Sequence, residues 1–223
     1  MKKLSAEDHA KVSAAIAAAE AKSDGEIVAI ATERSDAYHD VGLHYAVLAL
    51  FVLLAGFAAA PQCLEGQFDR LNDWTVEPGL RELLLLLLFL ALATFLGALF
   101  LLKYMPLRLA LTPGATKARR VRRRAIDLFK AGAERRTIGR TGILIYLSMG
   151  EHRAEIVADE AITSVTTPET WGEAMAALLV EVKAGRPGDG IVAAVAMIGE
   201  VLTEHFPKTS EDRNEIPDKL IEL

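Results

Sequence analysis

Hydrophobic positions are concentrated in two long blocks that contain no Asp, Glu, Lys or Arg. The blocks run from Val41 to Ala60 and from Leu83 to Leu102, and each contains twenty residues. Twenty residues span about 30 Å as a helix, which matches the hydrocarbon thickness of a bilayer. A pair of buried helices in a soluble protein would not need two such blocks. The pattern therefore predicts transmembrane helices at 41–60 and 83–102, joined by a loop at 61–82.

The polar region before the first block predicts one helix and one strand. Ser5 is placed to cap a helix, with Asp8 as its third residue. A Ser-Asp-Gly sequence at 23–25 breaks the helical pattern, and a continuous apolar run follows at 26–32. Such a run is typical of a strand that is buried on both faces. Because one helix and one strand cannot bury each other sufficiently, residues 1–40 need partners elsewhere in the chain.

The region after the second block supplies these partners. Its apolar patterns predict helices at 117–130, 167–182 and 191–206, and strands at 143–148 and 153–158. The last of these helices is apolar on nearly all sides but short for a membrane span, which favours a place in a protein core. We therefore expect an α/β fold, an α/β/α sandwich around a small mixed sheet. Its two parts, 1–40 and 103–223, are split by the transmembrane hairpin.

The charged residues predict which parts of the chain are cytoplasmic. The loop at 61–82 contains two arginines and five acidic residues, whereas Lys103 to Arg124 contains eight basic residues and no acidic one. The positive-inside rule places the basic segment in the cytoplasm and the loop in the periplasm. Two spans return the chain to its starting side, so both termini are expected in the cytoplasm. Cys63 is the only cysteine, which excludes an internal disulfide and argues against a cysteine-based metal site.

Five of the six residues from Arg119 to Arg124 are arginines. Nucleic-acid binding is disfavoured as their role, because no aromatic residues are interleaved and the net charge of the chain is −5. The run follows shortly after a predicted span, where each basic residue close to the surface gains about 1 kcal/mol from anionic lipid headgroups. We expect contact with the lipid bilayer and with anionic headgroups near Arg119–Arg124.

Several stretches share the layout of a known family. They are "GEIVAIATERSDAYHD" before the hairpin, "TGILIYLSMGEHRAEIVADEAI" after it, Trp171, and the C-terminal "GEVLTEHFP" and "NEIPDKL". In this layout the chain resembles the TPM-domain proteins, and most closely their bacterial membrane branch, in which a transmembrane hairpin interrupts the domain. The resemblance implies an α/β/α sandwich. Members of the family are associated with photosystem repair, and some resemble acid phosphatases or bind calcium. The chain departs from many members in having "ADEAI" where they have a Gly-rich stretch.

Glu151, Asp159 and Glu160 are the candidate ligands of a divalent cation such as Ca²⁺. Carboxylate oxygens suit such an ion, and α/β folds hold ligands beyond the carboxyl ends of their strands. Two alternatives stay open, because Glu151 lies in the turn "SMGEHR" and Asp159 is also placed to cap a following helix. The chain contains no Gly-x-Ser-x-Gly, phosphate-binding loop or His-Glu-x-x-His motif, so no catalytic residue is assigned.

The sequence thus predicts a two-pass protein of the bacterial inner (plasma) membrane that carries a cytoplasmic TPM-like binding or quality-control module. One alternative is a metal-dependent, acid-phosphatase-like hydrolase on the same fold, with Glu151, Asp159 and Glu160 around the ion. Another is a structural subunit whose Leu-rich second span packs against a membrane-protein partner.

Overall fold

The computed structural model describes residues 4–71, 78–132, 141–209 and 218–223. The chain divides into two compact units. The sheet unit comprises residues 1–36 and 114–223, and the hairpin unit comprises residues 37–113. The sheet unit is therefore built from two segments that the hairpin unit separates in the sequence.

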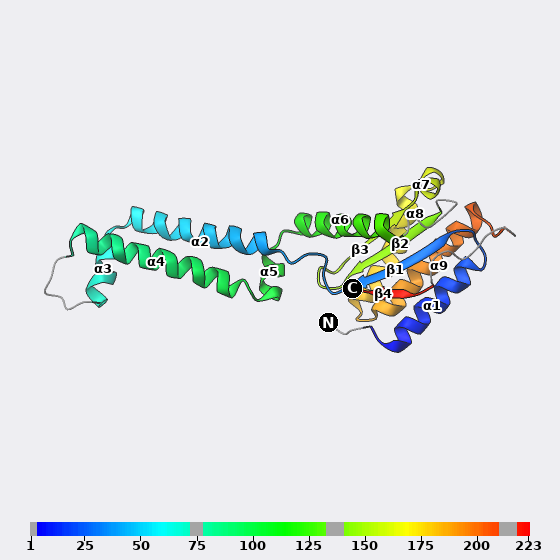
Figure 1. The fold of residues 1–223 in the computed structure, drawn as a ribbon, viewed down its shortest axis with the longest axis horizontal. Helices are drawn as coiled ribbons and strands as arrows, with labels where there is room; N and C mark the ends of the chain where they lie inside the picture. Colours follow the sequence, from blue (N-terminus) through cyan, green and yellow to red (C-terminus); the bar gives the residue numbers. More distant parts are fainter. Residues whose placement is uncertain (1–3, 72–77, 133–140, 210–217) are drawn as a thin grey trace. The chain divides into compact units, whose positions relative to one another are not determined.

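A four-stranded mixed sheet with the order β3-β2-β1-β4 forms the centre of the sheet unit (Figure 1). Its strands are β1 (Glu26–Thr32), β2 (Gly142–Ser148), β3 (Arg153–Ala158) and β4 (Leu220–Glu222). β1 is parallel to both β2 and β4, whereas β3 is antiparallel to β2. Every residue of β1 and β2 is buried. Burial on both faces explains why these two strands have unbroken apolar sequences rather than alternating ones.

Helices cover both faces of this sheet (Figure 1). On one face, α6 (Gly114–Gly132) packs Val121, Ala125 and Phe129 against the sheet. On the other face lie α1 (Ala6–Glu20), α8 (Pro168–Lys183) and α9 (Pro187–His205), which form the larger core cluster. The arrangement confirms the predicted α/β/α sandwich with a small mixed sheet.

The start of α1 shows how local sequence determines an element. The backbone N–H of Asp8 donates to Ser5 Oγ at 3.1 Å, and the backbone N–H of Ser5 donates to Asp8 Oδ2 at 2.8 Å. This capping box satisfies two backbone donors that the first turn of a helix leaves without partners. One and two turns further on, Val12 and Ile16 are fully buried, which fixes the face that α1 turns to the sheet.

Two elements of the sheet unit were not given bounds by the sequence, although a helix after Asp159 was one of the open alternatives. They are the short helix α7 (Glu160–Val165) and the C-terminal strand β4. Each contributes one buried apolar side chain to the larger core cluster, Ile162 and Leu220 respectively. Segments of six and three residues are too short to display a periodic pattern, which is why the sequence did not define their bounds.

The hairpin unit consists of α2 (His39–Ala59), α3 (Gln62–Leu71), α4 (Leu80–Leu101) and α5 (Met105–Leu111). α2 and α4 lie side by side (Figure 1). Within the described residues, these two helices are long and apolar enough to cross a membrane. They overlap the predicted spans 41–60 and 83–102, while the membrane boundaries themselves stay predictions. Many of their large apolar side chains are exposed, among them Phe51, Leu88 and Phe89.

Candidate functional site

The carboxyl ends of β1 and β2 form the candidate site of the sheet unit. Thr32 and Ser148, the last residues of the two strands, are paired in the parallel register. β1 continues through the hairpin unit to α6, whereas β2 continues through β3 to the helices on the opposite face. Ligands of α/β folds bind where the connections of neighbouring strands diverge in this way. We call this region the carboxyl edge; it comprises Thr32, Ser35, Tyr146, Ser148 and Glu151.

Glu151 is buried at the carboxyl edge and holds two chain segments together. Its Oε1 accepts a hydrogen bond of 2.8 Å from the backbone N–H of Ser35, which follows β1. Its Oε2 accepts a hydrogen bond from the Ser148 hydroxyl at the end of β2. Both carboxylate oxygens are therefore engaged within the protein, which agrees with the structural alternative that the sequence left open for this residue.

Tyr146 is the largest side chain of the carboxyl edge and is fully buried. Its hydroxyl lies 3.0 Å from Ser35 Oγ, and either oxygen can be the donor. Burial raises the pKa of the Tyr146 phenol, and the negative charge of Glu151 adds to this effect, while the hydrogen bond to Ser35 opposes it. The phenol thus stays protonated at neutral pH and acts as a hydrogen-bonding group.

The turn that contains Glu151 is fixed by backbone contacts to the segment after β1. The N–H of Met149 donates to the carbonyl of Thr32 at 3.0 Å, and the N–H of Gly150 donates to that of Glu33 at 2.7 Å. His152 is exposed and adopts the left-handed region with φ 51°. This conformation is uncommon for a residue with a Cβ, although His adopts it more often than most residues. The stretch "GEHR" is thus organised as a tight turn between β2 and β3.

Asp159 lies at the other end of β2. It occupies the N-cap position of α7, but its side chain makes no capping hydrogen bond. Instead, Asp159 Oδ2 accepts a hydrogen bond of 3.1 Å from the backbone N–H of Gly142, the first residue of β2. Glu160 is exposed in the first turn of α7.

The structure does not bring the three predicted ligands together. Glu151 contacts the last residue of β2 and Asp159 contacts the first, and a strand of this length spans about 20 Å. The prediction placed Asp159 beyond the carboxyl end of its strand. However, β3 is antiparallel, so its carboxyl end lies at the amino edge of β1 and β2. Glu151 and Asp159 therefore cannot share one ion.

The carboxyl edge, as described, does not fit a calcium ion. Ca²⁺ takes six to eight oxygen ligands, and no group of three His, Cys, Asp or Glu side chains within the described residues is placed to hold a metal. Glu151 already accepts hydrogen bonds on both oxygens. Cation binding itself stays a prediction.

Glu20 is an ionisable residue in the core that the sequence did not single out. It ends α1, is 6% exposed, and its Oε1 accepts a hydrogen bond of 2.7 Å from the backbone N–H of Ile27. Its Oε2 is buried and has no hydrogen-bond partner among the described residues. Burial is the main cause that raises the pKa of Glu20 to about 9. The hydrogen bond from Ile27 lowers this pKa, and the negative charges of Glu26 and Asp218 raise it further.

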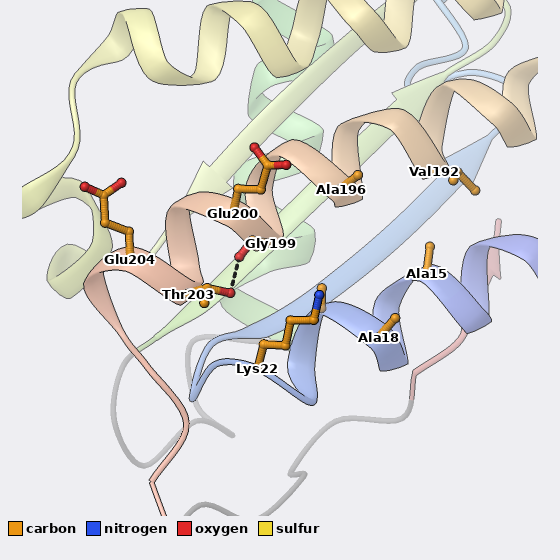
Figure 2. Close-up of a pocket in the computed structure, with 10 residues that line it drawn as sticks. Ala15, Ala18, Lys22, Val192, Ala196, Gly199, Glu200, Thr203 and Glu204 are labelled. Atoms are coloured by element: carbon orange, nitrogen blue, oxygen red, sulfur yellow. Dashed lines mark hydrogen bonds between the residues drawn. The ribbon is translucent and has the colours of Figure 1, made fainter.

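An open groove of about 550 Å³ lies between α1 and α9 (Figure 2). Small side chains line most of it, and in Figure 2 Ala15 and Ala18 on α1 face Val192 and Ala196 on α9. Gly199 allows the close approach of the two helices, because a Cβ there would lie 2.8 Å from Ala19 Cβ. The only polar side chains that line this part of the described structure are Lys22, Glu200, Thr203 and Glu204. The Thr203 hydroxyl donates to the carbonyl of Gly199 at 2.7 Å, and most of the remaining lining is apolar, as in a packing surface.

Comparison with known proteins identifies a family profile and a similar solved structure. Residues 108–201 match the profile of the TPM domain. The NMR structure of the BA42 protein from the psychrophilic bacterium Bizionia argentinensis is similar, with a TM-score of 0.57 and 18% sequence identity. That similarity covers 100% of this chain and 97% of the other, and at this identity it concerns the fold alone. No curated protein matches the chain significantly.

Proposed function

Since residues 108–201 of this chain match the TPM domain, we propose that it is a two-pass protein of the bacterial inner membrane. Its TPM domain acts in the cytoplasm as a binding or quality-control module. The hairpin unit is the anchor, and the sheet unit is the module that recognises the partner.

The outward-facing apolar surface of α2 and α4 carries this proposal. Helix α4 has no buried residue along its whole length, although its side chains are almost all apolar. In water, apolar surface costs about 25 cal/mol for each Å² that stays exposed. A bilayer removes this cost, because both helices have the length that its hydrocarbon core requires.

The hydrogen bonds that already engage the polar groups of the carboxyl edge favour binding over catalysis. Its carboxylate is held by Ser35 and Ser148, and its phenol is buried beside Ser35. These contacts stiffen the loops that flank the edge, as a recognition surface requires, and leave no group poised as a nucleophile among the residues described there.

The outer face of α6 is the proposed contact for anionic lipid headgroups. Val121, Ala125 and Phe129 define the buried face, and Arg119 and Arg123 lie on the opposite, exposed side. Arg120 is committed within the sheet unit, because its Nη1 lies 3.2 Å from Asp36 Oδ2. Arg119 and Arg123 are therefore placed to meet phosphate groups, to which arginine donates in a bidentate manner.

Extraction of membranes at alkaline pH tests the anchor. We expect the full-length chain to stay in the membrane pellet after carbonate treatment, which releases proteins held only by charge, and to dissolve only in detergent. Release of the chain by carbonate without detergent would contradict the proposal. Because the match to the TPM domain covers residues 108–201 and does not include α2 or α4, this outcome would leave that match intact.

A thermal melt, combined with a phosphatase assay and with co-purification, separates the binding module from the predicted alternatives. The full-length protein in detergent is heated with EDTA, Ca²⁺, Mg²⁺ or Zn²⁺, and a ligand at a hundred times its Kd stabilises the native state by about 2.7 kcal/mol. We expect no turnover of a generic phosphomonoester under any of these conditions. Metal-dependent turnover that is lost in Asp159→Ala would favour the hydrolase, and stoichiometric co-purification with a membrane protein would favour the structural subunit.

A further inference from the structure

Helix α5, at the end of the hairpin unit, exposes apolar residues and buries its charged residue. The exposed residues of this seven-residue helix are Pro106, Leu107, Ala110 and Leu111, none of which is polar. Its charged residue, Arg108, points inward and is only 6% exposed. A helix on the surface of a water-soluble domain shows the opposite pattern.

Arg108 holds α5 against both long helices of the hairpin unit. Its Nε donates to the carbonyl of Leu102 at 2.7 Å, and Leu102 is the C-cap residue of α4. Its Nη1 donates to the carbonyl of Ala37 at 2.7 Å and lies 3.3 Å from His39 Nδ1, at the start of α2. A guanidinium at a helix C-terminus is favoured, because it satisfies a carbonyl without a helical partner and complements the helix dipole.

Further contacts fix the orientation of α5. The hydroxyl of Tyr45 on α2 donates to the carbonyl of Leu111 at 2.9 Å, and the hydroxyl of Thr112 donates to that of Arg108 at 2.8 Å. The apolar face is therefore presented outward by several hydrogen bonds. Arg108 belongs to the basic segment after the second predicted span. Its guanidinium donates to carbonyl groups inside the hairpin unit and is therefore unavailable to lipid phosphates.

The residues that join α4 to α5 continue the same apolar surface. Phe100, at 72% exposure, and Leu101 end α4, and Tyr104, at 67% exposure, precedes α5. The Lys103 ammonium lies 5.8 Å from the centroid of the Phe100 ring. Exposed tyrosine and lysine next to a long apolar helix are typical of the boundary between hydrocarbon and headgroups.

We propose that α5 is an interfacial helix, whose outer face of Leu107 and Leu111 inserts into the boundary between acyl chains and headgroups at the end of the second span. The proposal rests on the membrane anchor proposed above, and its occupant is the lipid bilayer. Continuity with the apolar surface of α4 and the inward position of Arg108 distinguish this face from an ordinary solvent-exposed helix.

Spin labelling of the full-length chain in lipid nanodiscs tests the proposal. In a Cys63→Ser background, nitroxides are attached at Leu107→Cys and Leu111→Cys, and their collision rates with oxygen and with a water-soluble nickel chelate are measured. Leu92→Cys on α4 provides the reference for lipid, and the exposed Val180→Cys on α8 provides the reference for water. We expect oxygen-to-nickel collision ratios at Leu107 and Leu111 several-fold above the water reference and below the lipid reference.

Three results would overturn the inference. Ratios at Leu107 and Leu111 equal to the water reference, with Leu92 in lipid, would place α5 in solvent and leave the anchor intact. Protection of both labels from both reagents would show that protein covers the face. A water-like ratio at Leu92 would overturn the anchor and the interfacial helix together, so the two failures are distinguishable.

Discussion

Glu20 places an ionisable carboxyl group inside the core of the sheet unit. Ile27 N donates to Oε1, and Asp218 is close enough to affect the pKa by charge and by side-chain hydrogen bonding. A protonated Glu20 can donate from Oε2 to Asp218, which supplies a partner for an otherwise unsatisfied buried oxygen. At neutral pH we therefore expect Glu20 to carry its proton.

This proton makes stability depend on pH. The pKa of Glu20 is raised from 4.5 to about 9 in the folded protein, so the unfolded chain releases the proton first as pH rises. Between pH 4.5 and about 9, the free energy of unfolding should fall by up to about 1.4 kcal/mol for each pH unit. Below and above this range, the contribution of Glu20 to the free energy of unfolding should not change with pH. Thermal melts of the full-length protein from pH 5 to 9 measure the slope. Glu20→Gln, which keeps an acceptor for Ile27 and gains a donor for Asp218, should flatten it; an unchanged slope would contradict the assignment.

Substitutions at the neighbouring residues Glu151 and His152 should have different effects on the free energy of unfolding. Glu151→Ala leaves the Ser35 N–H and the Ser148 hydroxyl without their acceptor, and we expect a loss of about 1–3 kcal/mol in the free energy of unfolding. His152→Gly relieves a left-handed backbone with φ 51° and should be neutral or stabilising by a few tenths to about 1 kcal/mol. Denaturation of the two variants in detergent measures both effects. A Glu151→Ala variant as stable as the wild type would remove Glu151 from its structural role.

At the scale of elements, helix α6 packs one side against the sheet and exposes arginines on the other. Arg123 lies exposed on its outer side, whereas the Arg120 side chain is 18% exposed and paired with Asp36. Loss of one exposed arginine near a bilayer costs about 1 kcal/mol, or a factor of about five in affinity for anionic headgroups. Arg123→Ala should therefore lower the ratio of anionic to zwitterionic lipid that co-purifies with the protein several-fold, and Arg120→Ala should not. Equal ratios in both variants and the wild type would contradict a lipid contact on the outer side of α6.

The sequence predicted long elements well and short ones poorly. The strands at 26–32 and 153–158 were predicted with the same bounds as β1 and β3, because burial on both faces and a polar turn make their limits visible. Helix α9 begins four residues earlier than predicted, at Pro187, whose fixed φ suits the first turn. α7 and β4 are held by tertiary contacts of Ile162 and Leu220, which leave no local pattern.

Glu151 is the one residue of the carboxyl edge that was also a predicted ligand, and its distance from Asp159 was not foreseen. Only four residues separate β2 from β3, and such a short link requires an antiparallel pair. That constraint alone places Asp159 at the opposite end of the sheet from Glu151. Ser35 and Glu20 carried no signal, because a serine after a strand and a glutamate at the end of an Ala-rich helix look like ordinary surface residues.

At the scale of the whole molecule, the hairpin unit, which is the proposed membrane anchor, separates the two segments of the sheet unit in the sequence. The division costs the fold little, because β1 and β2 pair in parallel register although more than a hundred residues separate them in the chain. Parallel neighbours need a long connection in any case, and here that connection includes the hairpin unit and α6. The hairpin unit at this position leaves the sheet and both of its covering layers complete.

The native Cys63 provides the most direct test of the central claim, that the hairpin unit spans the membrane with the sheet unit on the cytoplasmic side. Cys63 is exposed on α3, between the two long helices. In spheroplasts we expect a membrane-impermeant maleimide to label Cys63, whereas Val180→Cys in a Cys63→Ser background should be labelled only after lysis. Labelling of Val180→Cys in intact spheroplasts with protection of Cys63 would reverse the orientation. Protection of both until lysis would show that the hairpin unit does not cross the membrane.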